Sequence, residues 1–131
     1  MQTRIELSPI ARELIEGKNF AHLATVMPDG SPQVSPVWIA MRGDKILINT
    51  AEGRLKTKNM RRDPRVAISI SGQDDAYQRV SIRGRVVEAT HEGADADIDM
   101  LSEKYIGKTY QNHRADEQRV TVLIEPLKVT G

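Results

Sequence analysis

The chain of 131 residues has no cysteine, one tryptophan and one phenylalanine, and its 19 basic and 18 acidic residues nearly cancel. The lack of cysteine excludes disulfide bonds and thiolate metal ligands. A net charge of +1 argues against a protein that binds polyanions over its whole surface. No apolar run approaches the ~20 residues of a membrane span. Residues 1–17 also lack the basic-then-apolar order of a secretory signal. We therefore expect a cytoplasmic protein.

The length fits one domain, residues 1–131, with room for a hydrophobic core. Most of its apolar residues fall in short runs that alternate or are rich in β-branched residues, as strands are. Short turns separate most of these runs, which favours a mainly β (α+β) fold, a closed or nearly closed antiparallel barrel. The six predicted strands are residues 20–27, 32–41, 45–50, 65–71, 77–89 and 119–126.

Two further segments have the signals of helices. In SPIARELIEG, Ser8 suits the N-cap, Pro9 the first helical position and Gly17 the end. In GADADIDMLSEKYIG, residues 93–107, acids precede Lys104, as the helix dipole prefers. The stretch after it, residues 107–118, has no periodicity and is predicted to be a polar loop.

A strongly basic run follows the third predicted strand. Within residues 50–66, six positions are Lys or Arg, and only Glu52 and Asp63 oppose them. One interpretation is a solvated surface helix that ends at Asp63–Pro64, because charge runs usually face water and the apolar residues here form no stripe. On this interpretation the run binds no ligand.

The spacing of the run also suits an anion site. Arg54 and Lys56 come directly after a strand end and a glycine, where a helix that begins near Arg54 would direct its free N–H groups and positive dipole end. A guanidinium supplies a planar fork of donors and an ammonium a point charge, which together suit phosphate. Asn49 and Thr50 could add donors, and Asn59 could cap the helix or contact the ligand.

Residues 20–70, FAHLATVMPDGSPQVSPVWIAMRGDKILINTAEGRLKTKNMRRDPRVAISI, closely resemble the flavin/deazaflavin oxidoreductase family. This is the split β-barrel superfamily that includes pyridoxamine 5'-phosphate oxidase. The combination of LAT…DG.P..SPVW with T…GR.K..N..RDPRV carries the resemblance, which continues through VSIRGRVVEAT, LSEKYIG and RVTVLIEPLKVTG. It implies a split β-barrel that forms a homodimer, with the cofactor in a groove between the two barrels.

The resemblance also implies which residues bind the cofactor. The basic residues after the third strand would hold its phosphate, and polar groups at the strand end would contact the phosphate or the ribityl chain. The second strand of the first hairpin would line the tricyclic ring and add polar contacts. The implied cofactor-binding residues are Gln33, Ser35, Pro36, Val37, Trp38, Asn49, Thr50, Arg54, Lys56, Lys58 and Asn59.

Family members use either FMN or the deazaflavin coenzyme F420. The segment GRLKTKNMRRDPRVAISI and the ending EPLKVTG are more similar to the deazaflavin branch, and Arg61, Arg62 or Arg65 could meet an acidic cofactor tail. The resemblance thus implies an F420-dependent oxidoreductase that transfers a hydride between its cofactor and an unsaturated or quinone-like small molecule. The alternative is an FMN-binding oxidoreductase or flavin-binding protein. No catalytic side chain is assigned, because the cofactor supplies the chemistry.

Several other residues have two interpretations. Trp38 is either a core or dimer-interface residue or a wall beside the ring. Tyr105, Tyr110 and His113 flank the polar loop; they either have no role or close over a substrate and donate a proton. His91 and His113 lack ligand spacing, so no metal site is expected. Exposed aromatic residues are few, so we expect no nucleic-acid partner.

Overall fold

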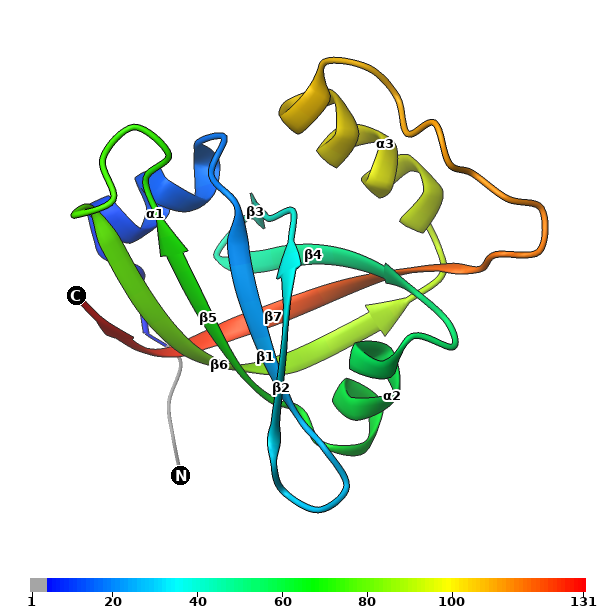
Figure 1. Cartoon of the computed structure of the whole chain (residues 1–131), viewed down its shortest axis with the longest axis horizontal. Helices are drawn as coiled ribbons and strands as arrows, with labels where there is room; N and C mark the ends of the chain where they lie inside the picture. The colour runs from blue at the N-terminus through cyan, green and yellow to red at the C-terminus, as the bar shows by residue number, and fades with distance from the viewer. Residues whose placement is uncertain (1–4) are drawn as a thin grey trace.

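The computed structural model describes residues 5–131, and residues 1–4 of the N-terminal stretch lie outside the described part. One antiparallel sheet runs through the molecule in the order β2-β1-β5-β6-β7-β4-β3, with three helices around it (Figure 1). No helix within residues 5–131 is long and apolar enough to cross a membrane. The elements are α1 (Pro9–Glu16), β1 (Ala21–Val26), β2 (Pro32–Val37), β3 (Ala40–Arg42), β4 (Lys45–Ala51), α2 (Leu55–Arg62), β5 (Arg65–Ser71), β6 (Arg79–Thr90), α3 (Ala94–Ile106) and β7 (Arg119–Thr130).

The mainly β antiparallel fold is confirmed, but the sheet has seven strands rather than the predicted six, and it is not closed. The predicted strand 32–41 divides into β2 and β3, which form opposite edges of the open sheet. The division lies at Trp38 and Ile39. The backbone N–H and carbonyl of Ile39 bond to the side chains of Tyr105 and Lys104, so this residue pairs with a helix rather than continuing a strand.

Strand β4 is buried on both faces, which explains why its sequence is a continuous apolar run rather than an alternation. Ile46 and Ile48 point into the main core, which α1 also covers. Leu47 points the other way and packs with Ile98 and Leu101 of α3 in a second cluster. The sheet therefore lies between two apolar layers at this position.

The helix signals read from the sequence are confirmed at both predicted helices. The Ser8 hydroxyl accepts a hydrogen bond from the N–H of Ala11, and Gly17 caps the other end of α1. Helix α3 begins after Gly93 and ends at Gly107, both with left-handed φ angles, of 76° and 78°.

Candidate functional site

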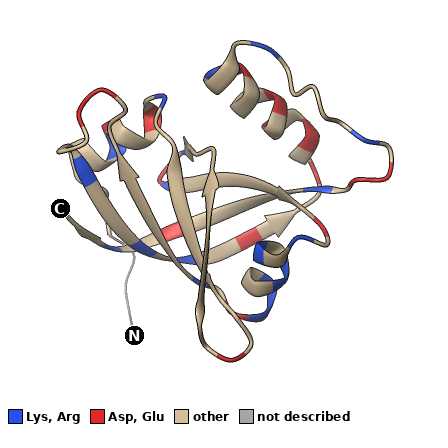
Figure 2. Cartoon of the chain, in the orientation of Figure 1, with Lys and Arg blue, Asp and Glu red and all other residues tan. Residues whose placement is uncertain are grey.

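A tight turn joins β4 to α2 and carries the predicted anion site. Gly53 has a φ of 88°, which a glycine adopts without strain, and the chain reverses there between Ala51 and Arg54. Arg54 is the N-cap of α2, and Asp63 ends the helix as predicted. Figure 2 shows Lys and Arg gathered on α2 and on the turn before it.

The first turn of α2 combines unpaired backbone donors with positive charge. It contains no acidic residue, and Arg54 provides no side-chain cap. The pKa of Lys56 lies below its ordinary 10.5, because the side chain is half-buried and because Arg54 and Arg119 lie near it. Cations at the positive end of a helix dipole oppose that dipole. This end of α2 is therefore suited to an anionic ligand that contacts both the cations and the free N–H groups.

Glu117 links two arginines beside this turn. Its Oε2 lies 3.5 Å from Nη2 of Arg54, and its Oε1 accepts a hydrogen bond of 3.0 Å from Nη1 of Arg119. Arg119 is buried, with 6% of its surface exposed. Burial raises the pKa of Glu117, but the two arginines lower it by a larger amount. The pKa of Glu117 therefore lies below its ordinary 4.5. Glu117 is thus an ionised neighbour of the predicted phosphate site.

Asn49, predicted to contact the cofactor, is buried under α3 and uses its amide within the fold. Its Oδ1 accepts from Nε of Arg119 at 2.9 Å, and its Nδ2 donates to the Ala94 carbonyl at 2.9 Å. The amide also lies 3.3 Å from the hydroxyl of Thr121, which donates to Asp97 of α3 at 2.6 Å. Asn49 therefore supports Arg119 from behind rather than presenting free donors to a ligand.

Thr50 has a similar internal role. Its Oγ1 lies 3.0 Å from Oγ1 of Thr57, whose hydroxyl donates to the Ala51 carbonyl at 2.7 Å. Since that proton of Thr57 is already used, Thr50 is the donor between the two hydroxyls. Both threonines are buried, and together they fix the end of β4 to the first turns of α2.

A chain of hydrogen bonds joins the two groups of predicted residues, on α2 and on β2. Asn59 of α2 is fully buried and donates to Thr25 Oγ1 at 3.0 Å, and Thr25 donates to Gln33 Oε1 at 2.8 Å. The same amide of Asn59 contacts the sulfur of Met27 and accepts from Arg62. Thr25 of β1 thus holds the start of β2 against α2.

The predicted ring-lining residues alternate along β2. Val37 is buried, Ser35 is half-buried, and Pro36 between them is exposed. The Oγ of Ser35 is buried and has no hydrogen-bond partner within residues 5–131. Trp38 is half-buried and stacks on the ring of Tyr105 at 5.4 Å. A bound polar ring would supply the hydrogen-bond partner that the Ser35 hydroxyl lacks. Together with the cationic start of α2, strand β2 therefore fits a cofactor that carries both a ring and a phosphate.

The remaining cations of the basic run differ in whether their side chains already have partners within the fold. Lys58 is exposed and makes no ion pair within the described part of the chain. By contrast, Arg61 pairs with Glu52 at 2.6 Å and Arg65 with Asp63 at 2.7 Å. Arg62 is likewise bonded within the fold, as described above. Lys58 is thus the freest of these side chains for a ligand.

The start of the polar loop after α3 is anchored. The N–H of Tyr110 donates to Asp99, and His113 Nε2 lies 2.9 Å from the same carboxylate oxygen. The Tyr110 ring also lies under Arg119, with the guanidinium carbon 5.2 Å from the ring centroid. Tyr110 therefore contributes to the packing around Arg119, and the exposed His113 pairs with Asp99.

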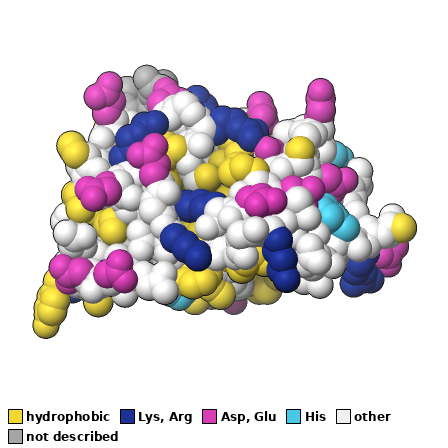
Figure 3. Space-filling model, turned by 90° about the horizontal axis from the view of Figure 1, so that it is seen from above, with side chains coloured by type: hydrophobic (Ala, Val, Ile, Leu, Met, Phe, Trp, Pro, Cys, Tyr) yellow, Lys and Arg dark blue, Asp and Glu magenta, His cyan; other side chains and the backbone are white. Residues whose placement is uncertain are grey.

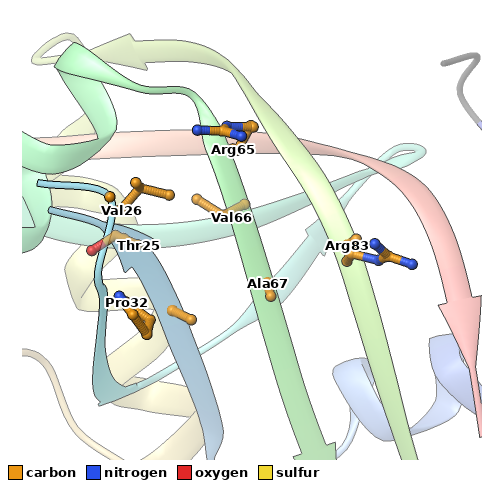
Figure 4. Close-up of a pocket in the computed structure, with 9 residues that line it drawn as sticks. Thr25, Val26, Pro32, Arg65, Val66, Ala67 and Arg83 are labelled. Carbon is orange, nitrogen blue, oxygen red and sulfur yellow. The ribbon is translucent and has the colours of Figure 1, made fainter. Parts of the chain in front are cut away.

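A shallow pocket of about 280 Å³ lies on the outer face of the sheet (Figure 4). Its lining comes from adjacent strands and includes Ala24 and Val26 of β1, Arg65 of β5 and Arg83 of β6. None of the predicted cofactor-binding residues lines it, but Thr25, which bonds to Asn59 and Gln33, does, so the pocket adjoins the candidate site.

Sequence reasoning missed three residues of this site, Thr25, Glu117 and Arg119. Arg119 opens an alternating apolar strand, and a charged residue in that position is one available signal of a buried ion pair. Thr25 sits in an ordinary strand and gives no such signal. Each of the three also has a partner far away in the chain, where sequence spacing cannot show it: Asn59 for Thr25, Arg54 for Glu117 and Asn49 for Arg119.

Comparison with known proteins places this geometry in context. The family model described as pyridoxamine 5'-phosphate oxidase matches residues 7–131. An F420 reductase structure is 29% identical over 91% of this chain and 94% of its own, with a TM-score of 0.83. A conserved hypothetical protein from Mycobacterium tuberculosis is 24% identical over 98% and 87%, with a TM-score of 0.74. HupZ of Group A Streptococcus is 17% identical over 94% and 91%, with a TM-score of 0.66.

Proposed function

The chain belongs to the pyridoxamine 5'-phosphate oxidase family, and on this premise we propose that it is an oxidoreductase that binds coenzyme F420. It would transfer a hydride between this deazaflavin and an unsaturated or quinone-like small molecule. The observation that carries the proposal is the cationic, uncapped start of α2, where Arg54 and Lys56 follow β4 directly. The similarity to an F420 reductase favours the deazaflavin over other cofactors of the family.

The phosphate of the cofactor would lie at the first turn of α2. Lys56 and Arg54 would supply charge, and the backbone N–H groups of that turn would supply directed donors. A bound anion would offset the cost of burying the Lys56 charge and the repulsion from Arg54 and Arg119, which together lower the pKa of Lys56. The exposed Lys58, one turn away from Arg54, would meet the acidic tail of F420.

The ring would lie along β2. Ser35 would donate its unpartnered hydroxyl to a polar edge of the ring, and the half-buried Trp38 would give the apolar part of the surface, whereas the predicted Val37 is packed in the main core. Gln33 is held by Thr25 at the start of the strand and would fix the end of the ring nearer to α2. Burial against these side chains would exclude water from the reacting face.

When bound, a deazaflavin supplies the hydride chemistry itself. The residues of this chain therefore need only bind, orient and shield, and positioning alone can lower a barrier by several kcal/mol, on the order of 7–11 at best. No residue near β2 and α2 is assigned as an acid or nucleophile.

FMN is the second candidate cofactor. Its phosphomonoester would satisfy the same donors at the start of α2, and the family match extends to flavin enzymes as well. The internal pairing of Arg61 and Arg65 with acids also leaves fewer free cations for an F420 tail than the sequence suggested.

A side-by-side titration with F420 and FMN tests the proposal. We expect micromolar or tighter binding of F420, with quenching of its fluorescence, and weaker binding of FMN. The double substitution Arg54→Ala, Lys56→Ala should abolish binding without lowering the melting temperature. Protein that purifies yellow and prefers FMN would establish the alternative, and binding of neither cofactor at about 100 µM, a concentration at which a site of ~8 kcal/mol is saturated, would refute both.

We also propose that the chain is a homodimer with the cofactor between subunits. The outer face of β2 supports this, because Val34 is 62% exposed there and Pro32 and Pro36 flank it on the same face. Sedimentation of the wild type and of Val34→Lys tests it. A dimer that dissociates on substitution is expected, and a wild-type monomer at all concentrations would contradict the proposal.

A further inference from the structure

The corner between β2 and β3 is held by α3 rather than by the sheet. Ile39 lies at this corner, and its side chain is fully buried. Its N–H donates to the hydroxyl of Tyr105 at 3.2 Å, and its carbonyl accepts from Lys104 Nζ at 2.6 Å. Two consecutive residues of α3 thus bind both backbone groups of one residue, 65 or more positions earlier in the chain. We call Ile39, Lys104 and Tyr105 the corner clasp.

Lys104 ties three elements together. Its ammonium group also donates to the carbonyl of Ile15, at the end of α1, over 2.7 Å. Hydrogen bonds from a charged donor are about twice as strong as neutral ones. The side chain is only half-exposed, and its burial, against the smaller opposing effect of Glu16, lowers its pKa to about 8. Desolvating the ammonium group of Lys104 costs free energy. Its two hydrogen bonds, to the carbonyls of Ile15 and Ile39, offset this cost in the folded protein.

Tyr105 carries the other half of the clasp. Its hydroxyl donates to the Asn19 carbonyl at 2.6 Å while accepting from Ile39. Its ring stacks on Trp38 at 5.4 Å and nearly parallel, at 9°, and on Phe20 at 5.4 Å. The clasp therefore fixes the indole as well as the backbone. Figure 3 views the molecule from the side of α1 and α3 and shows hydrophobic side chains near its centre among Lys and Arg.

Strand β2 needs such a support because it is an edge strand, paired on one side only, with β1. At its start, Gln33 is bonded through Thr25 to Asn59 of α2. At its end, the corner clasp holds the chain just beyond Val37. The strand is thus tethered at two points, Gln33 and Ile39, which at about 3.3 Å per residue are separated by roughly 20 Å of extended chain.

We propose that Lys104 and Tyr105 are positioning residues that set the orientation of β2 and Trp38 as the surface on which the cofactor ring lies. This inference rests on the proposed function, in which Ser35 and Trp38 contact the ring. The phosphate would bind at α2, at the other tether. Releasing the clasp should therefore weaken recognition of the ring and leave recognition of the phosphate intact.

The test uses the single tryptophan as a reporter of the corner. In Lys104→Met, we expect the emission of Trp38 to shift to longer wavelength and its quenching by acrylamide to increase. Binding of F420 or FMN should weaken about tenfold, as expected when a preorganised surface must be ordered on binding. The affinity for inorganic phosphate, measured by calorimetry, should change less than twofold. Tyr105→Phe, which keeps the ring but loses the hydroxyl, should show the same pattern to a smaller degree.

Two controls make the outcome decisive. Lys108→Met removes an exposed lysine just beyond α3 and should change none of these quantities. Lys104→Arg keeps a charged donor and should retain much of the affinity for F420 or FMN that Lys104→Met loses. Unchanged Trp38 emission and ligand affinity in Lys104→Met would overturn the proposal, as would an equal loss of phosphate binding. Absence of cofactor binding by the unsubstituted protein would instead refute the proposed function, while the Trp38 emission would still report whether the clasp holds the corner.

Discussion

The carboxylate of Glu117 lies 3.5 Å from the guanidinium of Arg54, the N-cap residue of helix α2. Arg54, which is predicted to bind the phosphate, is therefore already paired with an acid that lies just before β7. Because the same carboxylate also accepts a bond from the buried Arg119, it is well held in place. An incoming phosphate must share Arg54 with Glu117 or displace it.

Removing the charge of Glu117 is expected to strengthen anion binding. In Glu117→Gln, the amide oxygen still accepts from Arg119, but Arg54 loses its ionic partner and turns to the ligand. We expect several-fold tighter binding of inorganic phosphate, and of F420 or FMN, by calorimetry, since a partly exposed ion pair is worth about 0–1 kcal/mol. Asp116→Asn is the matched control, because Asp116 is exposed and pairs with Arg114 rather than with Arg54 or Arg119 among residues 5–131. Weaker binding in Glu117→Gln would show that the carboxylate aligns Arg54 rather than competing for it.

Lys56→Met should separate stability from binding. The pKa of Lys56 is lowered by burial and by two neighbouring arginines, so its charge opposes folding of the free protein. The apolar side chain removes that cost, and we expect a slightly higher melting temperature together with at least tenfold weaker phosphate binding, about 1.4 kcal/mol or more. Lys58→Met, at an exposed position, should leave the melting temperature unchanged. A loss of stability in Lys56→Met would mean that the ammonium supports the fold.

Asn59→Ala should act mainly on stability. The amide is fully buried and bonds to Thr25 and Arg62, both of which would lose a partner. We expect the free energy of unfolding to fall by ~1–3 kcal/mol, the cost of leaving buried polar groups unpaired. Urea denaturation measures this, with the exposed Asn112→Ala as control. Full stability combined with lost cofactor binding would instead assign Asn59 to the ligand.

Lys104 should make stability depend on pH above neutrality. Burial lowers its pKa to about 8 in the folded protein, against an ordinary 10.5. Between these values the unfolded chain binds more protons, so the free energy of unfolding attributable to this group rises with pH and is lost again as pH falls through about 8. Urea midpoints of the wild type, relative to Lys104→Met, should therefore rise from about pH 7 to about pH 10. A difference between the two proteins that stays constant across this range would mean that Lys104 titrates normally.

Local sequence signals predicted local structure well. Ser8 and Gly17 bound α1, and the alternation of Val66, Ile68 and Ile70 set the buried face of β5. Such features depend on a few neighbouring residues and on one periodicity. The break of the segment 32–41 into two strands was not predictable in this way, because its cause is the contact of Ile39 with Lys104 and Tyr105.

In the candidate site, too, the sequence predicted some features and only the structure showed the others. Its cations were visible as a run of charge, and a strand, a glycine and a helix placed Arg54 and Lys56 together. The role of each polar residue was not visible. Asn49 and Thr50 carry donors that suit a ligand, but the fold buries both and uses their hydrogen bonds itself.

The sequence by itself determined most strands and helices, though not the break between β2 and β3, and it determined where positive charge gathers, because these features follow from spacing along the chain. Tertiary structure alone decided which polar groups stay free for a ligand, since Asn49 and Arg119 meet across 70 positions. A buried donor must find an acceptor wherever the packed chain brings one. Only the folded molecule leaves Ser35 without a partner and gives Arg54 an acidic neighbour.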